Sequence, residues 1–224
     1  MFFRILFIIC TFSFNAFAQP QNEFWRGPFF WDTKPEIKSR MIKEKYVTVS
    51  VTSSDENGSL VWWMKGAGVV KAPLDFTYKY ASDFSQLEKQ KDHFDKVKWN
   101  KKKKELELTM TSFSKKVKLK VRFWESLGAK PAKGDKTEQT RYLHFKLLEG
   151  PFMPGEGAFI FNATQQEYTE VALIARHEGD LMIFGSSLVS VAIEGVLQHM
   201  ADSLRLAVED AWQKKQAKVN SRGL

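Results

Sequence analysis

The chain has 224 residues, a formal net charge of +8 and one cysteine, Cys10. A single cysteine excludes an intrachain disulfide framework and a metal site built from several thiolates. No apolar run is long enough to cross a bilayer as a helix, and about 200 residues can bury a core that needs no cross-links. We therefore expect one globular domain.

The first eighteen residues are typical of a secretory signal peptide. Arg4 supplies a positive start, residues 5–14 are mostly apolar, and Ala16-Phe17-Ala18 has the small–x–small form that signal peptidase cleaves. Cleavage after Ala18 would remove both Arg4 and Cys10, leaving a net charge of +7 and no thiol nucleophile. We expect a periplasmic or secreted protein.

Residues 19–44 form an aromatic-rich N-terminal arm, which we expect to be docked rather than mobile, because exposed aromatic side chains favour aggregation. Strand patterns then recur, with apolar residues at alternate positions. They cover residues 45–53, 60–71, 94–99, 105–113, 116–125, 141–149, 158–163 and 169–177. Asn57-Gly58 predicts a hairpin turn, and Ala72-Pro73 separates the second strand from one or two short helices within residues 74–91.

Residues 187–215 predict one long amphipathic helix, and residues 216–224 a flexible tail. Apolar residues recur in the helix with the i, i+3, i+4, i+7 spacing of a single face. They are Val189, Ile193, Val196, Leu197, Met200, Leu204, Ala207, Val208 and Ala211. The opposite side carries Glu194, Gln198, Asp202, Arg205 and Glu209. We expect Val196 and Met200 to face a sheet, and Gln198 and Asp202 to face solvent.

This order of elements predicts an α+β fold over residues 45–215. An antiparallel sheet with one apolar face must cover that face, and the long helix is the element available to do so. We expect a curved antiparallel β-sheet that grips one long C-terminal α-helix, with short helices after the first core strands.

Several segments occur in a recognisable order. They are Gly68-Val69-Val70-Lys71-Ala72-Pro73-Leu74, Asp83-Phe84 with Leu87, Leu147-Leu148-Glu149-Gly150-Pro151-Phe152, Gly155-Glu156-Gly157 with Phe159 and Phe161, and Tyr168-Thr169-Glu170-Val171. Together with the long helix they resemble the START-like, or SRPBCC, helix-grip superfamily, which includes the polyketide cyclase and coenzyme Q-binding groups. The N-terminal arm and Trp62-Trp63 have no counterpart in this resemblance.

The resemblance implies an apolar cavity between sheet and helix that holds a lipid, a quinone or a similar molecule. The residues expected to bind this ligand are Trp62, Met64, Met110, Leu119, Phe145 and Met200. The same apolar pattern also fits a closely packed core without a ligand, and both interpretations stay open at this point.

Catalytic patterns are absent from the sequence. The four histidines have no HExxH spacing, and neither a GxSxG motif nor a dinucleotide-binding loop is present. His144 falls on the solvated side of its predicted strand. We expect no metal and no cofactor, and we favour a carrier of an apolar small molecule over an enzyme of the cyclase or aromatase type. A third alternative is a scaffold that binds another envelope component through a basic sheet face.

Basic residues gather in one region: Lys101 to Lys104, then Lys115, Lys116, Lys118, Lys120 and Arg122. One interpretation is a patch for the anionic surface of a membrane or for acidic envelope polymers. The alternation with Val117, Leu119 and Val121 favours a simpler one, the solvated face of a half-buried strand. Export argues against a nucleic-acid partner, and we expect a monomer.

Overall fold

A computed structural model describes residues 35–89, 94–112, 115–127, 140–150, 153–163, 167–179 and 186–221. Eight strands form one antiparallel sheet in the order β1-β2-β8-β7-β6-β5-β4-β3. They are β1 (Thr48–Glu56), β2 (Ser59–Val70), β3 (Lys96–Asn100), β4 (Glu105–Ser112), β5 (Lys115–Leu127), β6 (Thr140–Glu149), β7 (Gly155–Ala163) and β8 (Thr169–Glu178). The helices are α1 (Pro35–Lys43), α2 (Leu74–Ala81), the 3-10 helix η1 (Phe84–Lys89) and α3 (Ser186–Asn220).

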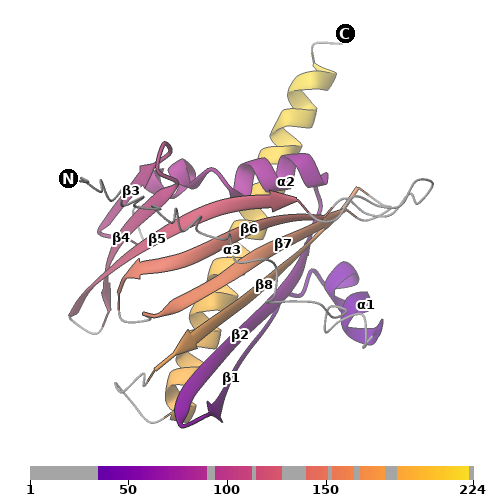
Figure 1. Cartoon of the computed structure of the whole chain (residues 1–224). Helices are drawn as coiled ribbons and strands as arrows, with labels where there is room; N and C mark the ends of the chain where they lie inside the picture. The colour runs from indigo at the N-terminus through magenta and orange to yellow at the C-terminus, as the bar shows by residue number, and fades with distance from the viewer. Residues whose placement is uncertain are drawn as a thin grey trace, which may run out of the picture.

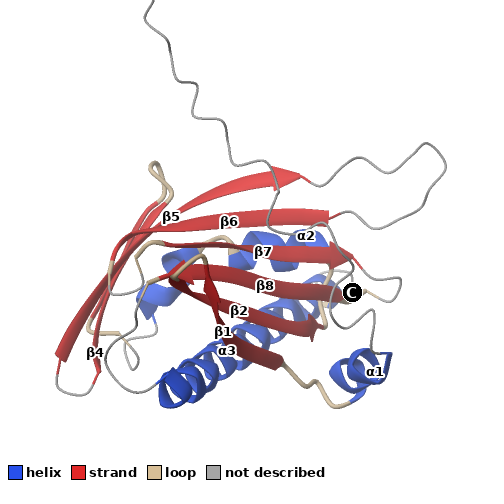
Figure 2. Ribbon diagram, turned by 60° about the horizontal axis from the view of Figure 1, so that its bottom comes forward, coloured by secondary structure: helices blue, strands red, loops and turns tan. Residues whose placement is uncertain are grey.

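The sheet curls around α3, with α2 across one end of it (Figures 1 and 2). This arrangement confirms the predicted α+β fold, in which a curved antiparallel sheet grips a long C-terminal helix. α3 ends at Asn220 rather than near Lys215, so the first part of the predicted tail is helical. The predicted signal peptide, residues 1–18, lies outside the described residues.

The β1–β2 hairpin turns at the predicted Asn57-Gly58 pair. Both residues have positive φ, 56° and 81°, which asparagine and glycine adopt at low cost. The Asp55 carboxylate accepts a hydrogen bond of 2.9 Å from the Gly58 N–H. The turn sets the register in which Val51 lies opposite Met64.

Ala72 and Pro73 end β2 and begin α2, as predicted. Proline fits the start of a helix, where its missing N–H is not needed, and Pro73 stands at the N-cap of α2. The buried Ala72 carbonyl accepts hydrogen bonds from the hydroxyls of Thr77 and Thr169, at 3.3 and 2.7 Å. These bonds hold the start of α2 against the start of β8.

Different helices cover the two faces of the sheet. Side chains alternate along a strand, so even and odd residues of β2 point to opposite sides. Trp62 and Met64 pack with Leu197 of α3 on what we call the inner face. Val69 packs with Met41 of α1 on the other side, the outer face.

Part of the N-terminal arm is helical, where the sequence indicated no regular structure. Pro35 occupies the first position of α1, Glu36 lies in its first turn and Lys43 in its last, an arrangement that suits the helix dipole. Met41 is 1% exposed and joins a buried cluster of the outer face. The other buried members are Ala67, Val69, Ala158, Ile160, Ala172 and Ile174.

The prediction that His144 lies on a solvated strand face is wrong. His144 is buried on the outer face between the rings of Trp124 and Tyr142, at centroid distances of 5.4 and 5.8 Å. Its Nε2 lies 2.8 Å from the Ser126 Oγ, and burial lowers the pKa of the imidazole. The aromatic neighbours come from two strands, so the pattern of one strand does not reveal them.

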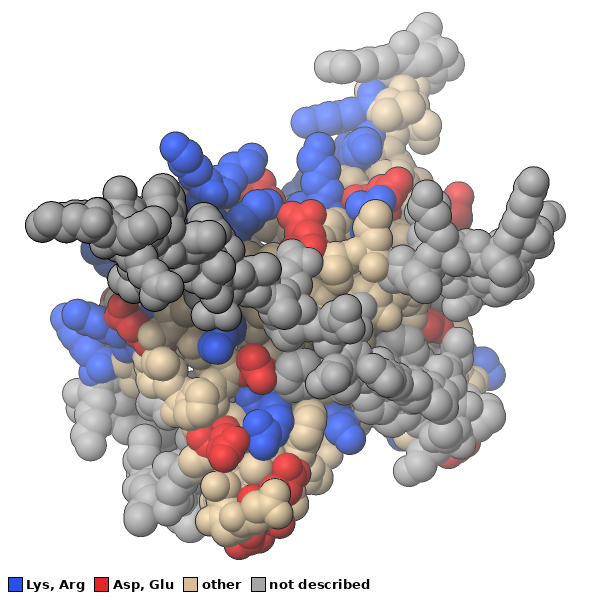
Figure 3. Space-filling view, in the orientation of Figure 1, with Lys and Arg blue, Asp and Glu red and all other residues tan. Residues whose placement is uncertain are grey.

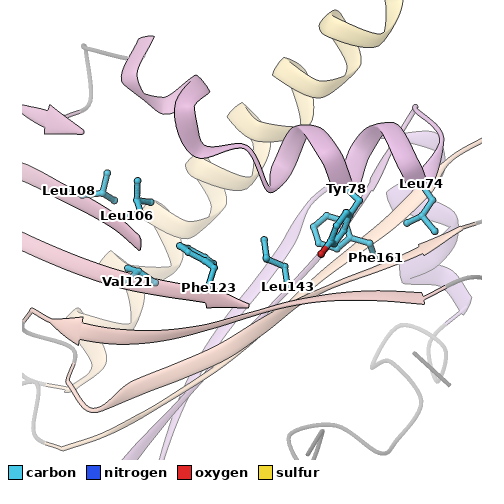
Figure 4. Packing of buried hydrophobic residues seen from close by; sticks show 8 residues of the cluster. All are labelled: Leu74, Tyr78, Leu106, Leu108, Val121, Phe123, Leu143 and Phe161. Atoms are coloured by element: carbon cyan, nitrogen blue, oxygen red, sulfur yellow. The ribbon is translucent and has the colours of Figure 1, made fainter. Parts of the chain in front are cut away.

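The largest inner-face cluster joins β4–β7 to α2 and η1, and we call it the aromatic half. Its buried members are Leu74, Tyr78, Leu106, Leu108, Val121, Phe123, Leu143 and Phe161 (Figure 4). Phe161 meets Tyr78 edge to face at 5.2 Å, and Phe123 stacks on Phe84 of η1 at 4.2 Å. Among the residues that the structure describes, this cluster has no member from α3.

Candidate functional site

α3 lies against the other end of the inner face, over β1 and β2. Val208 is 1% exposed and packs with Val70 and Ala72, and Leu197 packs with Trp62. The long helix is therefore buried against the first hairpin and α2, rather than against the aromatic half.

Polar side chains of α3 bind the backbone of β1 and of Val47, the residue just before it. The Val51 N–H donates to Glu194 Oε1 at 2.7 Å, and Gln198 Nε2 donates to the Val47 carbonyl at 2.7 Å. β1 is an edge strand, whose outer backbone groups would otherwise be open to another strand. These helix side chains occupy the first part of that edge.

Glu209 extends the same row of contacts. This carboxylate is buried, accepts a hydrogen bond of 3.0 Å from the Lys71 N–H, and lies 3.6 Å from Lys45 Nζ and 3.7 Å from Arg205 Nη1. A buried carboxylate is tolerated when cations and donors surround it. We refer to Glu194, Gln198, Arg205 and Glu209 together as the α3 clamp.

The predicted orientation of α3 is right for Leu197, Leu204 and Val208, which pack inward, but wrong for Gln198 and Met200. Gln198 was expected to face solvent but is half-buried, and it also donates to Asp202 at 3.3 Å. Met200 was expected to face the sheet but is 45% exposed. The polar stripe turns inward because it meets backbone donors and acceptors of an edge strand, which need partners. The side chain of Val196 lies outside the described residues.

The flank of α3 opposite the clamp is only partly covered. Successive helix residues are about 100° apart, so Met200, Ser203, Ala207 and Ala211 lie on the side away from the clamp. The strand order places β8, β7 and β6 on that side of β2. Met200 is 45% exposed and the other three residues are half-buried. We call these four residues the open flank of α3.

One row of inner-face residues crosses the sheet from β1 to β5. Successive cross-strand neighbours in it are Val51, Met64, Ala175, Gly157, Phe145 and Phe123. Large side chains stand at both ends, and Ala175 and Gly157 stand in the middle. An added Cβ at Gly157 would lie 2.7 Å from Phe145 Cζ and would collide with the Ile174 carbonyl oxygen, so only glycine fits beneath that ring.

The six residues predicted to bind a ligand fall into different places. Met64 and Phe145 belong to the row, and Trp62 packs in the same cluster as Met64. Leu119 is half-buried in the aromatic half, and Met200 lies on the open flank. The side chain of Met110 lies outside the described residues.

Ala175 and Gly157, the small residues at the centre of the row, were not among the predicted site residues. The prediction rested on large apolar side chains at alternate strand positions, and a small residue does not contribute to that pattern. The one available hint is Gly157 itself, because a glycine within a strand pattern often marks a close approach by another group.

Trp62 places a polar atom in this apolar surface. The residue is 1% exposed, and its indole Nε1–H has no hydrogen-bond partner among the described residues. A buried donor without a partner costs roughly 1–3 kcal/mol. Its cross-strand neighbour on β8 is His177, whose Nδ1 lies 2.9 Å from the Pro154 carbonyl oxygen.

Charged groups gather at the α2 end of the sheet. Burial, together with the nearby Glu125 carboxylate, raises the pKa of Tyr78, so its phenol stays protonated at neutral pH. Arg141 lies 5.1 Å from the Tyr78 ring centroid and pairs with Asp75, while Glu125 lies 3.0 Å from Lys104 Nζ.

Two features are absent from the described ranges. No three His, Cys, Asp or Glu side chains there come together as a metal site. No helix in those ranges is both long and apolar enough to cross a membrane.

The fold is a helix-grip fold: an antiparallel sheet curved around a long C-terminal helix. Similar solved structures include a START superfamily protein from Mycobacterium smegmatis, 17% identical, covering 66% of this chain and 98% of that one, with a TM-score of 0.47. A protein from Thermus thermophilus is 18% identical, covering 68% and 98%, with a TM-score of 0.47. Norcoclaurine synthase from Thalictrum flavum is 12% identical, covering 70% and 91%, with a TM-score of 0.48.

These similarities are distant, so the fold class is assigned from the strand order and the long helix of the chain itself. No family model matches the sequence, and no curated protein matches it at a significant level.

Proposed function

We propose that this protein is exported and binds an apolar small molecule between α3 and the aromatic half. The observation that carries the proposal is the open flank, because Met200 is 45% exposed on the side of α3 away from the clamp, where the strand order places β8, β7 and β6. Phe145 and Leu119 are only half-buried on the same inner face, and the small residues Ala175 and Gly157 lie between them and the first hairpin. A ligand there would remove apolar surface from water, which stabilises a complex by about 25 cal/mol per Å².

Trp62 suggests which apolar molecules fit. Its buried indole N–H can donate one hydrogen bond, so a ligand with an acceptor at one end would satisfy a donor that is otherwise unpaired. Esters, fatty acids and quinones carry such an acceptor on an apolar body. A carrier of lipids, quinones or similar molecules is therefore favoured over a binder of plain hydrocarbons.

Native mass spectrometry of the purified mature protein tests the proposal first. We expect a retained molecule that organic solvent extracts. Thermal unfolding with fatty acids, quinones and sterols then measures affinity, because a ligand that binds only the folded state raises Tm with its concentration. A Trp62→Phe variant should lose affinity for ligands with an acceptor while keeping its affinity for plain alkyl chains.

A matched pair of variants locates the site. Met200 and Leu206 are both exposed apolar residues of α3, but only Met200 lies on the open flank. Met200→Trp should weaken ligand binding or change the preferred ligand size about tenfold by filling the space, and Leu206→Trp should leave both unchanged. If no ligand shifts Tm, or if the two variants behave alike, the inner face is a packed core and the carrier function is wrong.

Export has a separate test. Ala16-Phe17-Ala18 predicts that the mature protein begins at Gln19. N-terminal sequencing of protein isolated from the periplasm or medium checks this directly. A product that retains Met1 in the cytoplasm would contradict export and leave the ligand proposal in place.

A further inference from the structure

Nearly all of the excess positive charge lies between positions 95 and 127. This segment holds eleven Lys and Arg against four Asp and Glu, a net charge of +7, whereas the whole chain carries +8. The segment contains β3, β4 and β5, which form one end of the sheet. The rest of the chain is close to neutral, so the charge asymmetry belongs to one three-stranded region.

All four acidic residues of this segment already interact within it. Glu105 pairs with Arg122 at 2.6 Å and with Lys120 at 3.5 Å, and Glu107 pairs with Lys120 at 3.6 Å. Glu125 pairs with Lys104 at 3.0 Å. Asp95 accepts a hydrogen bond of 2.6 Å from the Thr111 hydroxyl. These contacts hold the pKa of Glu105 below its usual value and raise that of Lys120, chiefly through Arg122 and Glu105 respectively. The negative charges are therefore matched, and the surplus is carried by other lysines.

Seven exposed lysines of this region form no salt bridge with a described residue. They are Lys96, Lys98, Lys101, Lys102, Lys103, Lys116 and Lys118, and we call them the lysine ribbon. The register places Lys96 and Lys118 on either side of Thr109, and Lys98 beside Glu107, so the strand lysines share the outer face. Figure 3 shows Lys and Arg side chains gathered over the β3–β5 end of that view.

We propose that the lysine ribbon docks the protein on an anionic bilayer surface. Protection of an edge strand explains lysines on β3, but it does not explain Lys116 and Lys118 on β5, which has β4 beside it. A surface of anionic headgroups attracts spread point charges without requiring a fixed geometry, and each lysine near it strengthens binding roughly fivefold.

The kind of cation favours a membrane over nucleic acid. Arginine is the side chain that binds phosphates and base edges with paired hydrogen bonds. Arg122 is the one arginine of the segment, and its Nε and Nη2 both donate to Glu105, at 3.1 and 2.6 Å. The ribbon itself consists of lysines alone.

Vesicle flotation of the mature protein tests the proposal. The probes are phosphatidylcholine vesicles with and without about 30% phosphatidylglycerol, at low and physiological salt. The ribbon variant is K96Q/K98Q/K116Q/K118Q. Its control, K43Q/K71Q/K79Q/K218Q, changes four exposed lysines on α1, α2, α3 and the residue after β2, and lowers the net charge equally. Circular dichroism checks that both variants fold.

We expect binding to the anionic vesicles alone, weaker at physiological salt. The ribbon variant should bind more than about tenfold less tightly, and the control should stay within about twofold of the parent protein. No binding to anionic vesicles, or an equal loss in both variants, would overturn the proposal. So would tighter binding of duplex DNA than of vesicles at the same salt, which would make the ribbon a nucleic-acid site. Neither result depends on whether the inner face holds a ligand.

Discussion

The two ends of the inner face are held together by different interactions. Over β1 and β2, α3 is fixed by apolar contacts of Val208 and Leu197 and by the clamp, whose side chains bond to an edge strand. In the aromatic half, α2 and η1 cover the sheet with rings such as Phe84 and Tyr78. One end is thus closed by directional polar bonds, the other by aromatic packing.

This difference indicates which part of the domain can rearrange its side chains without unfolding. Hydrogen bonds to a strand edge hold α3 in one position, because each requires a fixed donor–acceptor geometry. Apolar contacts are not directional, so the side chains of the aromatic half can rearrange without losing a specific bond. Substitutions at matched positions can show whether the two ends behave as separately as their contacts suggest.

The largest expected effect on stability distinguishes the buried side of α3 from its open flank. Val208→Asp would bury an unpaired charge at a position that is 1% exposed, and should cost more than about 4 kcal/mol in the free energy of unfolding. Met200→Asp, at a position 45% exposed, should cost less than about 1 kcal/mol. Urea unfolding measures both values. Equal costs would mean that the open flank is as deeply buried as Val208.

The next effect compares two phenylalanines of the aromatic half. Phe161 is 1% exposed, so Phe161→Ala should leave a cavity and cost about 3–5 kcal/mol. Phe145 is only half-buried, and Phe145→Ala should cost about half as much without ligand. Chemical denaturation of ligand-free protein checks this ratio. If Phe145→Ala is as costly as Phe161→Ala, the ring is part of a closed core rather than the wall of a binding space.

Breaking the clamp should have a smaller effect. Glu209→Gln keeps an acceptor for the Lys71 N–H but removes the charge between Lys45 and Arg205, and should cost about 2–3 kcal/mol. Asp210→Asn is the control, because Asp210 is exposed and pairs with Lys214 on the surface, so it should change stability by less than about 0.5 kcal/mol. Indistinguishable results would show that the clamp contributes little.

The smallest effect concerns the outer face and depends on pH. Burial lowers the pKa of His144 from its usual value of about 6.5, so the unfolded chain takes up a proton at higher pH than the folded chain does. Stability should therefore fall as the pH drops below about 6.5, and this contribution should level off below the folded-state pKa. His144→Phe keeps a ring stacked between Trp124 and Tyr142, and should remove this part of the pH dependence of the free energy of unfolding. An unchanged slope would place the titration elsewhere.

Sequence patterns predicted the strands and the long helix, because these depend on local periodicity. The Asn57-Gly58 turn and the Pro73 start of α2 are also local, and both lie where expected. The orientation of α3 was not predictable in this way. Whether Gln198 points outward depends on backbone about 150 positions earlier in the chain, just before β1, where the Val47 carbonyl accepts its hydrogen bond.

The candidate site was predictable in part for the same reason. Met64 and Phe145 are large apolar residues at alternating positions, so the pattern finds them. Ala175 and Gly157 lie between them only because the register of four strands aligns them, and register is set by turns and tertiary contacts rather than by one strand. The burial of His144 likewise depends on Trp124 of another strand.

The clamp also determines at which stage of synthesis the edge of β1 becomes protected from self-association. β1 is made early, whereas α3, which supplies Glu194 and Gln198, is made last. Synthesis runs from the N-terminus, so a growing or truncated chain has a β1 edge with no helix side chains to occupy it. An open strand edge pairs readily with another chain. Chains interrupted before α3 should therefore aggregate through β1, and completion of the last helix ends that period of risk.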